Sequence, residues 1–342
     1  MNSRRRIFFS SFFKYTLSLA VAALLFWWVY RDFNFSELFL RFQEVNLYFI
    51  LLSVLLGLLS YYLLAFRWTL LLKPVGYKLA APRAFMALMV GYFANLLLPR
   101  MSEVSRCLVL KKTDNVEVST SLGSVVAERS VDMATLLLVM AAGVFIEYDK
   151  LGNLLFSTLQ KQYSSLVIEP NFLLLLAVGL VFCVVLAFLL FIYIKRRFQR
   201  HFFFIKIRKV IREIIEGVMS LKKLDQPLGF WASTVTIWLL YFFMSYVVFF
   251  SFPPTMGLDV RAGISVLIMG GLGMATPVQG GVGPFHLFVS GVLLLYGIGR
   301  EDGVFFAFLI HTSQFLIMLI VGIVSFVASL VVSKRNSYVG QK

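Results

Sequence analysis

Long apolar runs recur along this chain, and each is close to the length of a membrane-spanning helix. Such a helix needs about 20 mostly apolar residues to cross the hydrocarbon core of a bilayer. Only 14% of the residues are charged and 60% are hydrophobic, whereas roughly 25% are charged in an ordinary soluble domain. A soluble globule must cover its outside with polar groups, and a disordered chain has few apolar residues. The sequence therefore predicts an integral membrane protein.

The apolar runs set the predicted elements. They lie at about 14–30, 47–72, 84–98, 119–145, 172–194, 228–252, 260–299 and 304–332. The first run follows a basic start and lacks a small-residue cleavage site, so we expect a retained span rather than a signal peptide. Cys107 and Cys183 give no disulfide framework, and we interpret both as free thiols.

Charge between the runs predicts their orientation. The stretch 195–223 holds ten basic and two acidic residues, which marks it as cytoplasmic by the positive-inside rule. Basic residues at both termini indicate the same side, as do Arg67, Lys73, Lys78, Arg83, Lys111 and Lys112 around the third run. The segments 31–46, 147–169, 253–261 and 299–303 hold six basic and nine acidic residues, a balance of −3 that suits the outer face.

This sidedness predicts two re-entrant helical hairpins. Both flanks of 84–110 are cytoplasmic and both flanks of 262–298 are external, so neither piece crosses the membrane. We therefore expect an all-α polytopic protein, residues 1–342 forming one membrane domain, with six full spans and both termini in the cytoplasm. The hairpins enter from opposite faces, each after two spans, which resembles an inverted repeat around a midplane site.

The net charge of +15 is compatible with nucleic-acid binding. In a chain this apolar, membrane orientation and anionic lipid explain it better, so no nucleic-acid partner is expected. The segment 198–224 mixes apolar and basic residues at helical spacing, which predicts an amphipathic helix on the cytoplasmic membrane surface.

The most informative charges are Glu128, Arg129 and Asp132, inside the run 119–145. At 1.5 Å per residue Arg129 lies about 15 Å into that helix, close to the middle of a core about 30 Å thick. Charges at this depth are costly unless paired or hydrated. Two readings remain open: a structural ion-pair network between helices, and a polar cavity that contacts a lipid headgroup or an ion.

The first hairpin carries a broken polar stretch. Pro99 interrupts the helix, and Asn95, Arg100, Glu103 and Arg106 surround the break. Guanidinium groups match phosphate with two hydrogen bonds, so Arg100 and Arg106 are candidate anion ligands, and Glu103 is spaced to pair with Arg106. The alternative is an ordinary cytoplasmic loop with orientation signals.

The second hairpin carries a glycine-rich turn around Gln279, with Gly280, Gly281 and Gly283. Glycine permits positive φ and close backbone approach, and exposed amides in such a turn can bind an anion. The alternative is a packing turn. His286 follows the turn and His311 lies in the last span. Each is either a hydrogen-bonded structural residue or part of a proton relay.

No catalytic motif and no metal-ligand spacing is present, so we expect no cofactor, no metal and, on balance, no enzyme. The ordered set of motifs resembles the flippase-like family known as the lysylphosphatidylglycerol synthase transmembrane region. The matching positions are Gly91-x-x-x-Asn95-x-x-x-Pro99, Glu103-x-x-Arg106, Glu128-Arg129-x-x-Asp132 and Pro277-x-x-Gly280-Gly281-x-Gly283. Two places depart from the family pattern. The family usually reads Pro-Gly-Arg-x-Gly-Glu where this chain has Pro99-Arg100-Met101-Ser102-Glu103, and it often has an acid where this chain has His286.

That family includes the lipid-translocating part of the bacterial multiple peptide resistance factor and proteins linked to lipid-bound glycans. The resemblance implies an inner-membrane protein that binds and translocates polar or anionic lipids, including polyprenyl-linked headgroups. It implies a site formed by the matching charged residues and the glycine turn. The alternatives are a membrane subunit of a lipid-headgroup aminoacyl- or glycosyl-transferase, and an accessory scaffold beside such a partner enzyme.

Overall fold

The computed structural model describes residues 41–97, 101–146, 224–276 and 278–339. Every regular element in these ranges is a helix. The predicted spans 14–30 and 172–194 and nearly all of the amphipathic segment 198–224 lie outside them. The elements are α3 (Leu47–Leu72), η1 (Lys73–Val75), α4 (Ala81–Leu97), α5 (Ser102–Asp114), α6 (Val118–Ile146), α10 (Pro227–Tyr246), η4 (Val247–Ser251), η5 (Pro253–Thr255), α11 (Val260–Ala275), η6 (Gln279–Gly281), α12 (Pro284–Leu294) and α13 (Arg300–Val339).

Local chemistry explains where several helices begin and end. The Asn46 side chain caps α3 by accepting from the Tyr48 amide at 3.0 Å, and Asp259 caps α11 through the Ala262 amide at 3.0 Å. The chain leaves η1 at Gly76, whose φ of 93° is left-handed. The α3 bounds coincide with the predicted run 47–72, because its apolar residues are continuous and its ends carry these signals.

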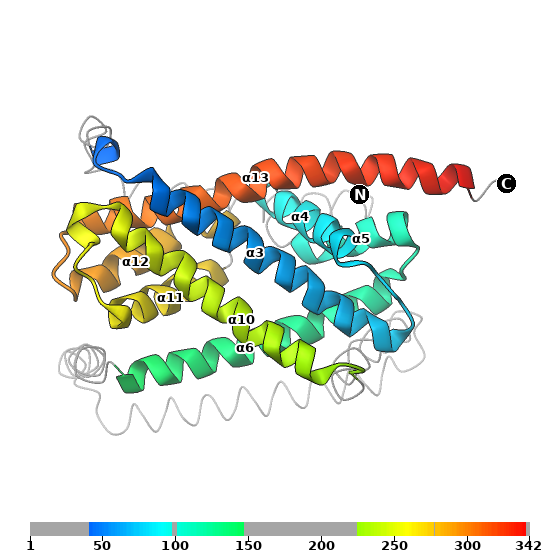
Figure 1. The fold of residues 1–342 in the computed structure, drawn as a ribbon, viewed down its shortest axis with the longest axis horizontal. Helices are drawn as coiled ribbons and strands as arrows, with labels where there is room; N and C mark the ends of the chain where they lie inside the picture. The colour runs from blue at the N-terminus through cyan, green and yellow to red at the C-terminus, as the bar shows by residue number, and fades with distance from the viewer. Residues whose placement is uncertain (1–40, 98–100, 147–223, 277, 340–342) are drawn as a thin grey trace, which may run out of the picture.

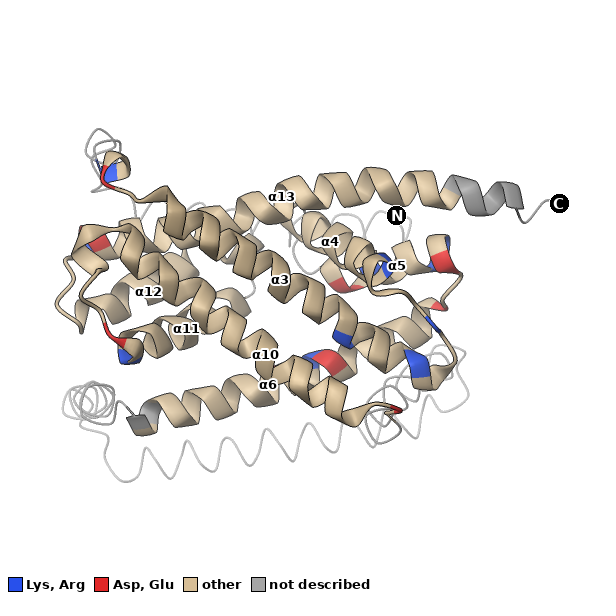
Figure 2. Cartoon of the chain, viewed as in Figure 1, with Lys and Arg blue, Asp and Glu red and all other residues tan. Residues whose placement is uncertain are grey.

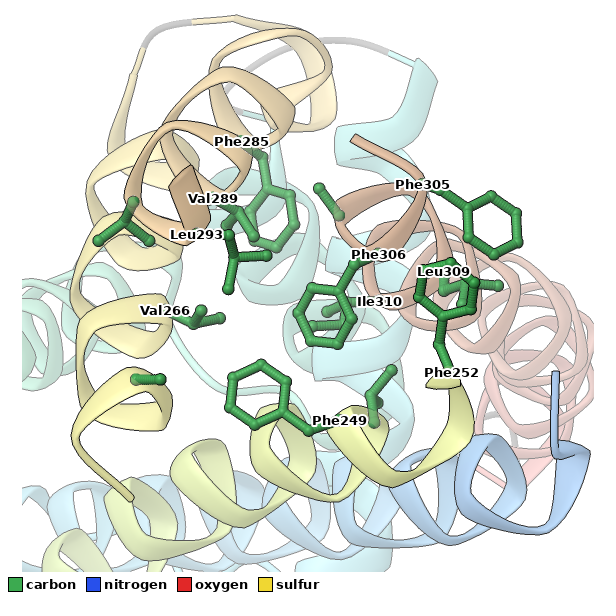
Figure 3. Close-up of a cluster of buried hydrophobic side chains, with 14 of the residues drawn as sticks. Phe249, Phe252, Val266, Phe285, Val289, Leu293, Phe305, Phe306, Leu309 and Ile310 are labelled. Carbon is green, nitrogen blue, oxygen red and sulfur yellow. The ribbon is translucent and has the colours of Figure 1, made fainter. Parts of the chain in front are cut away.

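The helices form an elongated bundle (Figure 1). The long helix α13 runs along one edge and contacts both α4 and α12, while α3 packs against α10. The pair α4–α5 occupies one end of the bundle and the pair α11–α12 the other end. Phenylalanines pack where the second pair meets η4 and α13, with the Phe249 and Phe306 rings stacked at 4.9 Å (Figure 3).

The surface supports a membrane environment. Large apolar side chains are exposed at helical spacing along α3, at Leu47, Leu51, Leu55 and Leu59, and similar side chains are exposed along α13. A stripe of this size is not stable in water but suits lipid. Within the described ranges, three helices are long and apolar enough to cross a membrane, at Leu47–Val75, Pro227–Ser251 and Arg300–Ser333. The predicted number of six spans stays a prediction.

The two predicted hairpin pieces each fold back on themselves. Tyr77, before α4, accepts a hydrogen bond from the Glu117 amide after α5, at 3.3 Å. In the second piece the Ser265 and Tyr296 hydroxyls lie 2.9 Å apart, at the start of α11 and the end of α12. At the opposite end of this second piece, η6 contacts α4 of the first. The pieces are helical hairpins, and their re-entry into the membrane stays a prediction.

Candidate functional site

The central feature of the site is an ion pair buried between α5 and α6. Both terminal nitrogens of Arg106 donate to Oε1 of Glu128 at 3.2 Å, and neither side chain is exposed. The Arg106 guanidinium lies over the Trp68 ring, 4.6 Å from its centroid. Trp68 is fixed in turn by donating to Ser124 Oγ at 2.9 Å. The Arg106 guanidinium is therefore held on one side by charge and on another by an aromatic face.

A glycine lets α5, which carries Arg106, pack closely against α4. A Cβ atom on Gly91 of α4 would lie 2.7 Å from the Ser102 carbonyl oxygen and 3.2 Å from Cβ of Arg106. Real Cβ atoms do not approach backbone oxygens this closely, so any side chain here would push α5 away. Gly91 thus allows Arg106 and its helix to lie directly against α4.

A second buried ion pair joins α3 to α6. Arg67 donates to Asp132 Oδ1 at 2.7 Å and to the Thr234 hydroxyl at 3.2 Å. The Arg67 side chain is completely buried, whereas 19% of the Asp132 side chain is exposed. Sequence reasoning assigned Arg67 only to orientation and missed this role. The available signal was its position inside the run 47–72, where an unpaired charge is costly.

The third pair is the accessible one. Arg129 Nε lies 3.7 Å from Glu103 Oε1, and the two side chains are 42% and 34% exposed. The expected pairing of Glu103 with Arg106 is wrong, because Arg106 turns into the interface with α6 and leaves Glu103 near the surface. Figure 2 shows acidic and basic residues near the crossing of α3, α6 and α10 and also on α5.

The buried pairs do not satisfy all of their own polar atoms. Glu128 Oε2, Arg106 Nε and Ser102 Oγ are buried and have no hydrogen-bond partner among the described residues. Buried polar atoms are paired in the large majority of cases, so each exception calls for an explanation. The network has spare acceptors and donors that water or a bound headgroup can use.

The predicted glycine turn has the backbone that the sequence indicates. Gly280, Gly281 and Gly283 have φ of 61°, 71° and 91°, all left-handed. On α11, a Cβ on Gly273 would lie 2.6 Å from the Phe285 Cα, so the two arms of the hairpin touch backbone to backbone. Gln279 lies in η6, but its side chain is outside the described part of the structure.

The two histidines meet at this turn. His311 on α13 hydrogen-bonds through Nε2 to the Gly280 carbonyl at 2.8 Å. His286 accepts from the Gly283 amide through Nδ1 at 3.4 Å and so caps α12. The ring centroids are 4.8 Å apart. One turn along α13, Gln314 accepts a hydrogen bond from Tyr61 on α3 at 3.2 Å, a contact that sequence reasoning missed.

The predicted residues thus fall into two groups. The first group is a charged site of three ion pairs, formed by Arg67, Glu103, Arg106, Glu128, Arg129 and Asp132. The second group is the glycine turn with His286 and His311. Asn95 lies in the last turn of α4, where that hairpin approaches η6, and Arg100 is outside the described residues. Within the described ranges no group of three His, Cys, Asp or Glu residues is placed to hold a metal.

An apolar exposed surface, opposed helical hairpins and paired charges inside the bundle define a multi-pass helical membrane protein. The chain belongs to the lysylphosphatidylglycerol synthase TM region family, whose sequence model matches residues 15–322. This match confirms the resemblance carried by the motifs and relates the protein to lipid modification or translocation. Comparisons with curated proteins and with solved structures gave no match.

Proposed function

We propose that this protein binds polar or anionic lipid headgroups at the charged site and moves them across the inner membrane. The observation that carries the proposal is the pair Arg129–Glu103, the only one of the three ion pairs with both side chains more than a third exposed. Its separation of 3.7 Å leaves the Arg129 guanidinium able to exchange its partner. A phosphate offers this guanidinium two well-aligned acceptors, which the carboxylate at that distance does not.

The two buried pairs support this role because they fix α6 on both sides of Arg129. Arg106 and Arg67 hold the flanking residues Glu128 and Asp132 of α6. A site built on a helix that is fixed on both sides is pre-organised for a ligand, which lowers the cost of binding. In this proposal Arg67 and Arg106 form the structural ion-pair network, and Arg129 and Glu103 bind the headgroup.

In this proposal the two hairpins form the path of the headgroup between the two faces of the membrane. The loop charges sort into two ends, because Lys73 pairs with Asp225 at 3.4 Å and Arg41 pairs with Glu301 at 2.7 Å and with Asp302. We assign the Lys73 end to the cytoplasm and the Arg41 end to the outer face. The two hairpins then re-enter from opposite sides, and their contact through η6 and α4 separates the two faces.

The test is lipid movement in vesicles that contain the purified protein. Fluorescent phosphatidylglycerol, phosphatidylethanolamine and an aminoacylated lipid are each incorporated, and a membrane-impermeant quencher measures the protected fraction. We expect Arg129→Ala to slow movement about tenfold to a hundredfold, because a hydrogen bond to a charged group contributes about 1.5–3 kcal/mol and 1.4 kcal/mol is tenfold.

The matched control is Arg41→Ala, which removes another arginine paired with carboxylates but at the end of the bundle. This control is expected to move lipid at the normal rate. Normal movement by a folded Arg129→Ala protein contradicts the site. Translocation is contradicted if, for every lipid tested, the wild-type protein leaves the fraction of lipid protected from the quencher unchanged.

A second candidate is a membrane subunit for a lipid-headgroup transferase. The observation in its favour is the family itself, whose description refers to the transmembrane region of a synthase. Copurification with a transferase, together with the absence of lipid movement by the isolated protein, would support this candidate. The described residues contain no group that we assign to headgroup chemistry.

A further inference from the structure

Two imidazoles meet at the turn of the second hairpin, His286 from α12 and His311 from α13, and their hydrogen bonds fix where their protons lie. A carbonyl oxygen only accepts, so His311 must donate to Gly280 through Nε2–H. A neutral imidazole has a single N–H, and therefore Nδ1 of His311 carries a lone pair. Among the described residues this nitrogen has no hydrogen-bond partner. His311 can take up a second proton there without giving up its bond to the turn.

His286 is arranged in the opposite way. Its Nδ1 accepts from the Gly283 amide, so the proton of the neutral ring is on Nε2. A second proton on Nδ1 would break the cap of α12 and would put positive charge at a helix N-terminus, where the macrodipole opposes it. Of the two rings, His311 is the one built to change its charge.

One neighbouring ring can stabilise a charged form of His311 against the cost of burying the charge. Its ring centroid lies 5.3 Å from that of Phe285, within the range of about 6 Å over which an aromatic ring attracts a cation. On the elements packed against α13, the titratable groups connected to His311 are His286 from α12, and Tyr61 from α3 through Gln314. Tyr92 from α4 packs on Tyr61 at 5.2 Å. The arginines and carboxylates of the charged site pair with one another.

We infer that His311 is the proton-binding residue that couples proton movement to lipid movement, an inference that rests on the proposed translocation. Protonation at Nδ1 makes an imidazolium, and the Nε2–H bond to the Gly280 carbonyl becomes charge-assisted and stronger. Loss of the proton weakens that bond. Because Gly280 belongs to η6, which contacts α4 of the first hairpin, the charge of His311 biases whether the two hairpins stay in contact.

The balance of the step is simple. A proton from water on one side adds to Nδ1, no other covalent bond forms or breaks, and the same proton leaves to water on the other side after the hairpins have rearranged. A lipid that moves in the same cycle then shares the free energy of the proton gradient. A gradient of one pH unit can hold about a tenfold lipid asymmetry if one proton moves per lipid.

The test uses vesicles with a pH difference of one unit and a potential clamped by valinomycin. Wild type is expected to build a lipid asymmetry that approaches about tenfold. His311→Gln keeps an N–H donor for Gly280 but takes up no proton, so it should equilibrate lipid and build no asymmetry. His286→Gln is the comparison variant, since glutamine at this position also caps a helix. It should still build the lipid asymmetry, whatever its rate of lipid equilibration.

A second measurement needs no variant. When a lipid gradient is imposed on wild-type vesicles, a pH dye in the lumen should report proton movement that requires the protein. If wild type moves lipid but the pH difference does not change the lipid distribution, the inference is overturned and the translocation proposal stands. Asymmetry retained by His311→Gln, or lost equally by His286→Gln, overturns the assignment to His311. No lipid movement under any gradient overturns both proposals.

Discussion

The two helical hairpins of this bundle are built from different interactions. The piece 84–110 holds Arg100, Glu103 and Arg106, and ion pairs tie its arm α5 to α6. The piece 262–298 contains no Asp, Glu, Lys or Arg. Its arms meet through the close contact at Gly273, and its turn is fixed by imidazole bonds.

This difference suggests different roles for the two hairpins, one as a fixed part and the other as a moving part. Ion pairs give the first hairpin a defined position and, in the proposed function, leave the Arg129–Glu103 pair for a ligand. Backbone contacts and neutral hydrogen bonds cost little to break and remake, so they suit a part that moves. Packing differs as well: a mixed cluster of leucines, alanines, Trp68 and tyrosines lies at the first hairpin, whereas phenylalanines of η4 and α13 pack against the second (Figure 3).

The largest expected effect is on the buried pair of the first hairpin. Glu128→Leu leaves the fully buried Arg106 guanidinium without a carboxylate, and we expect a loss of about 3–5 kcal/mol in the free energy of unfolding. The double variant Arg106→Met with Glu128→Leu removes both charges and should recover most of this loss. Denaturant unfolding in mixed micelles measures both. A single variant as stable as the double one would contradict a role of this pair in stability.

An intermediate effect is expected in the second hairpin. Gly273→Ala places a Cβ against the Phe285 backbone, which no rotamer change relieves, and should cost about 1–3 kcal/mol. Gly291→Ala is the control, because it also lies in an arm of the hairpin but has nothing within 4 Å. That change should be neutral or should stabilise α12 by about 0.5–1 kcal/mol. Equal losses from the two substitutions would show that the arms do not pack as described.

The smallest expected effect on stability is that of Arg129→Ala. Its ion pair is half-exposed, and such pairs contribute about 0–1 kcal/mol. Unfolding of this variant should therefore match wild type within about 1 kcal/mol, although its lipid movement is slowed. A loss as large as that of Glu128→Leu would make Arg129 a structural residue and would remove the distinction drawn within the charged site.

The sequence predicted the helical class and the positions of the helices, because apolar runs and caps are local signals. The run 47–72 coincides with α3, and 119–145 lies within α6 (Val118–Ile146). The depth of Glu128, Arg129 and Asp132 in the membrane was likewise predicted by counting residues along one helix, and it stays a prediction.

Partner choice could not be predicted in the same way. The pairing of Arg106 with Glu128 depends on how α5 rotates against α6, and a spacing of three along α5 pointed to Glu103 instead. Arg67 reaches Asp132 across two helices that are far apart in sequence. The hydrogen bond from His311 to Gly280 likewise depends on the packing of α13 against a turn.

The charged site has an electrical consequence. Three arginines and three carboxylates sum to zero, so the membrane potential exerts no net force on the site itself. Moving one elementary charge through 100 mV involves about 2.3 kcal/mol. If lipid moves as proposed, the voltage sensitivity of its transport then measures the charge of the lipid and of any proton that accompanies it.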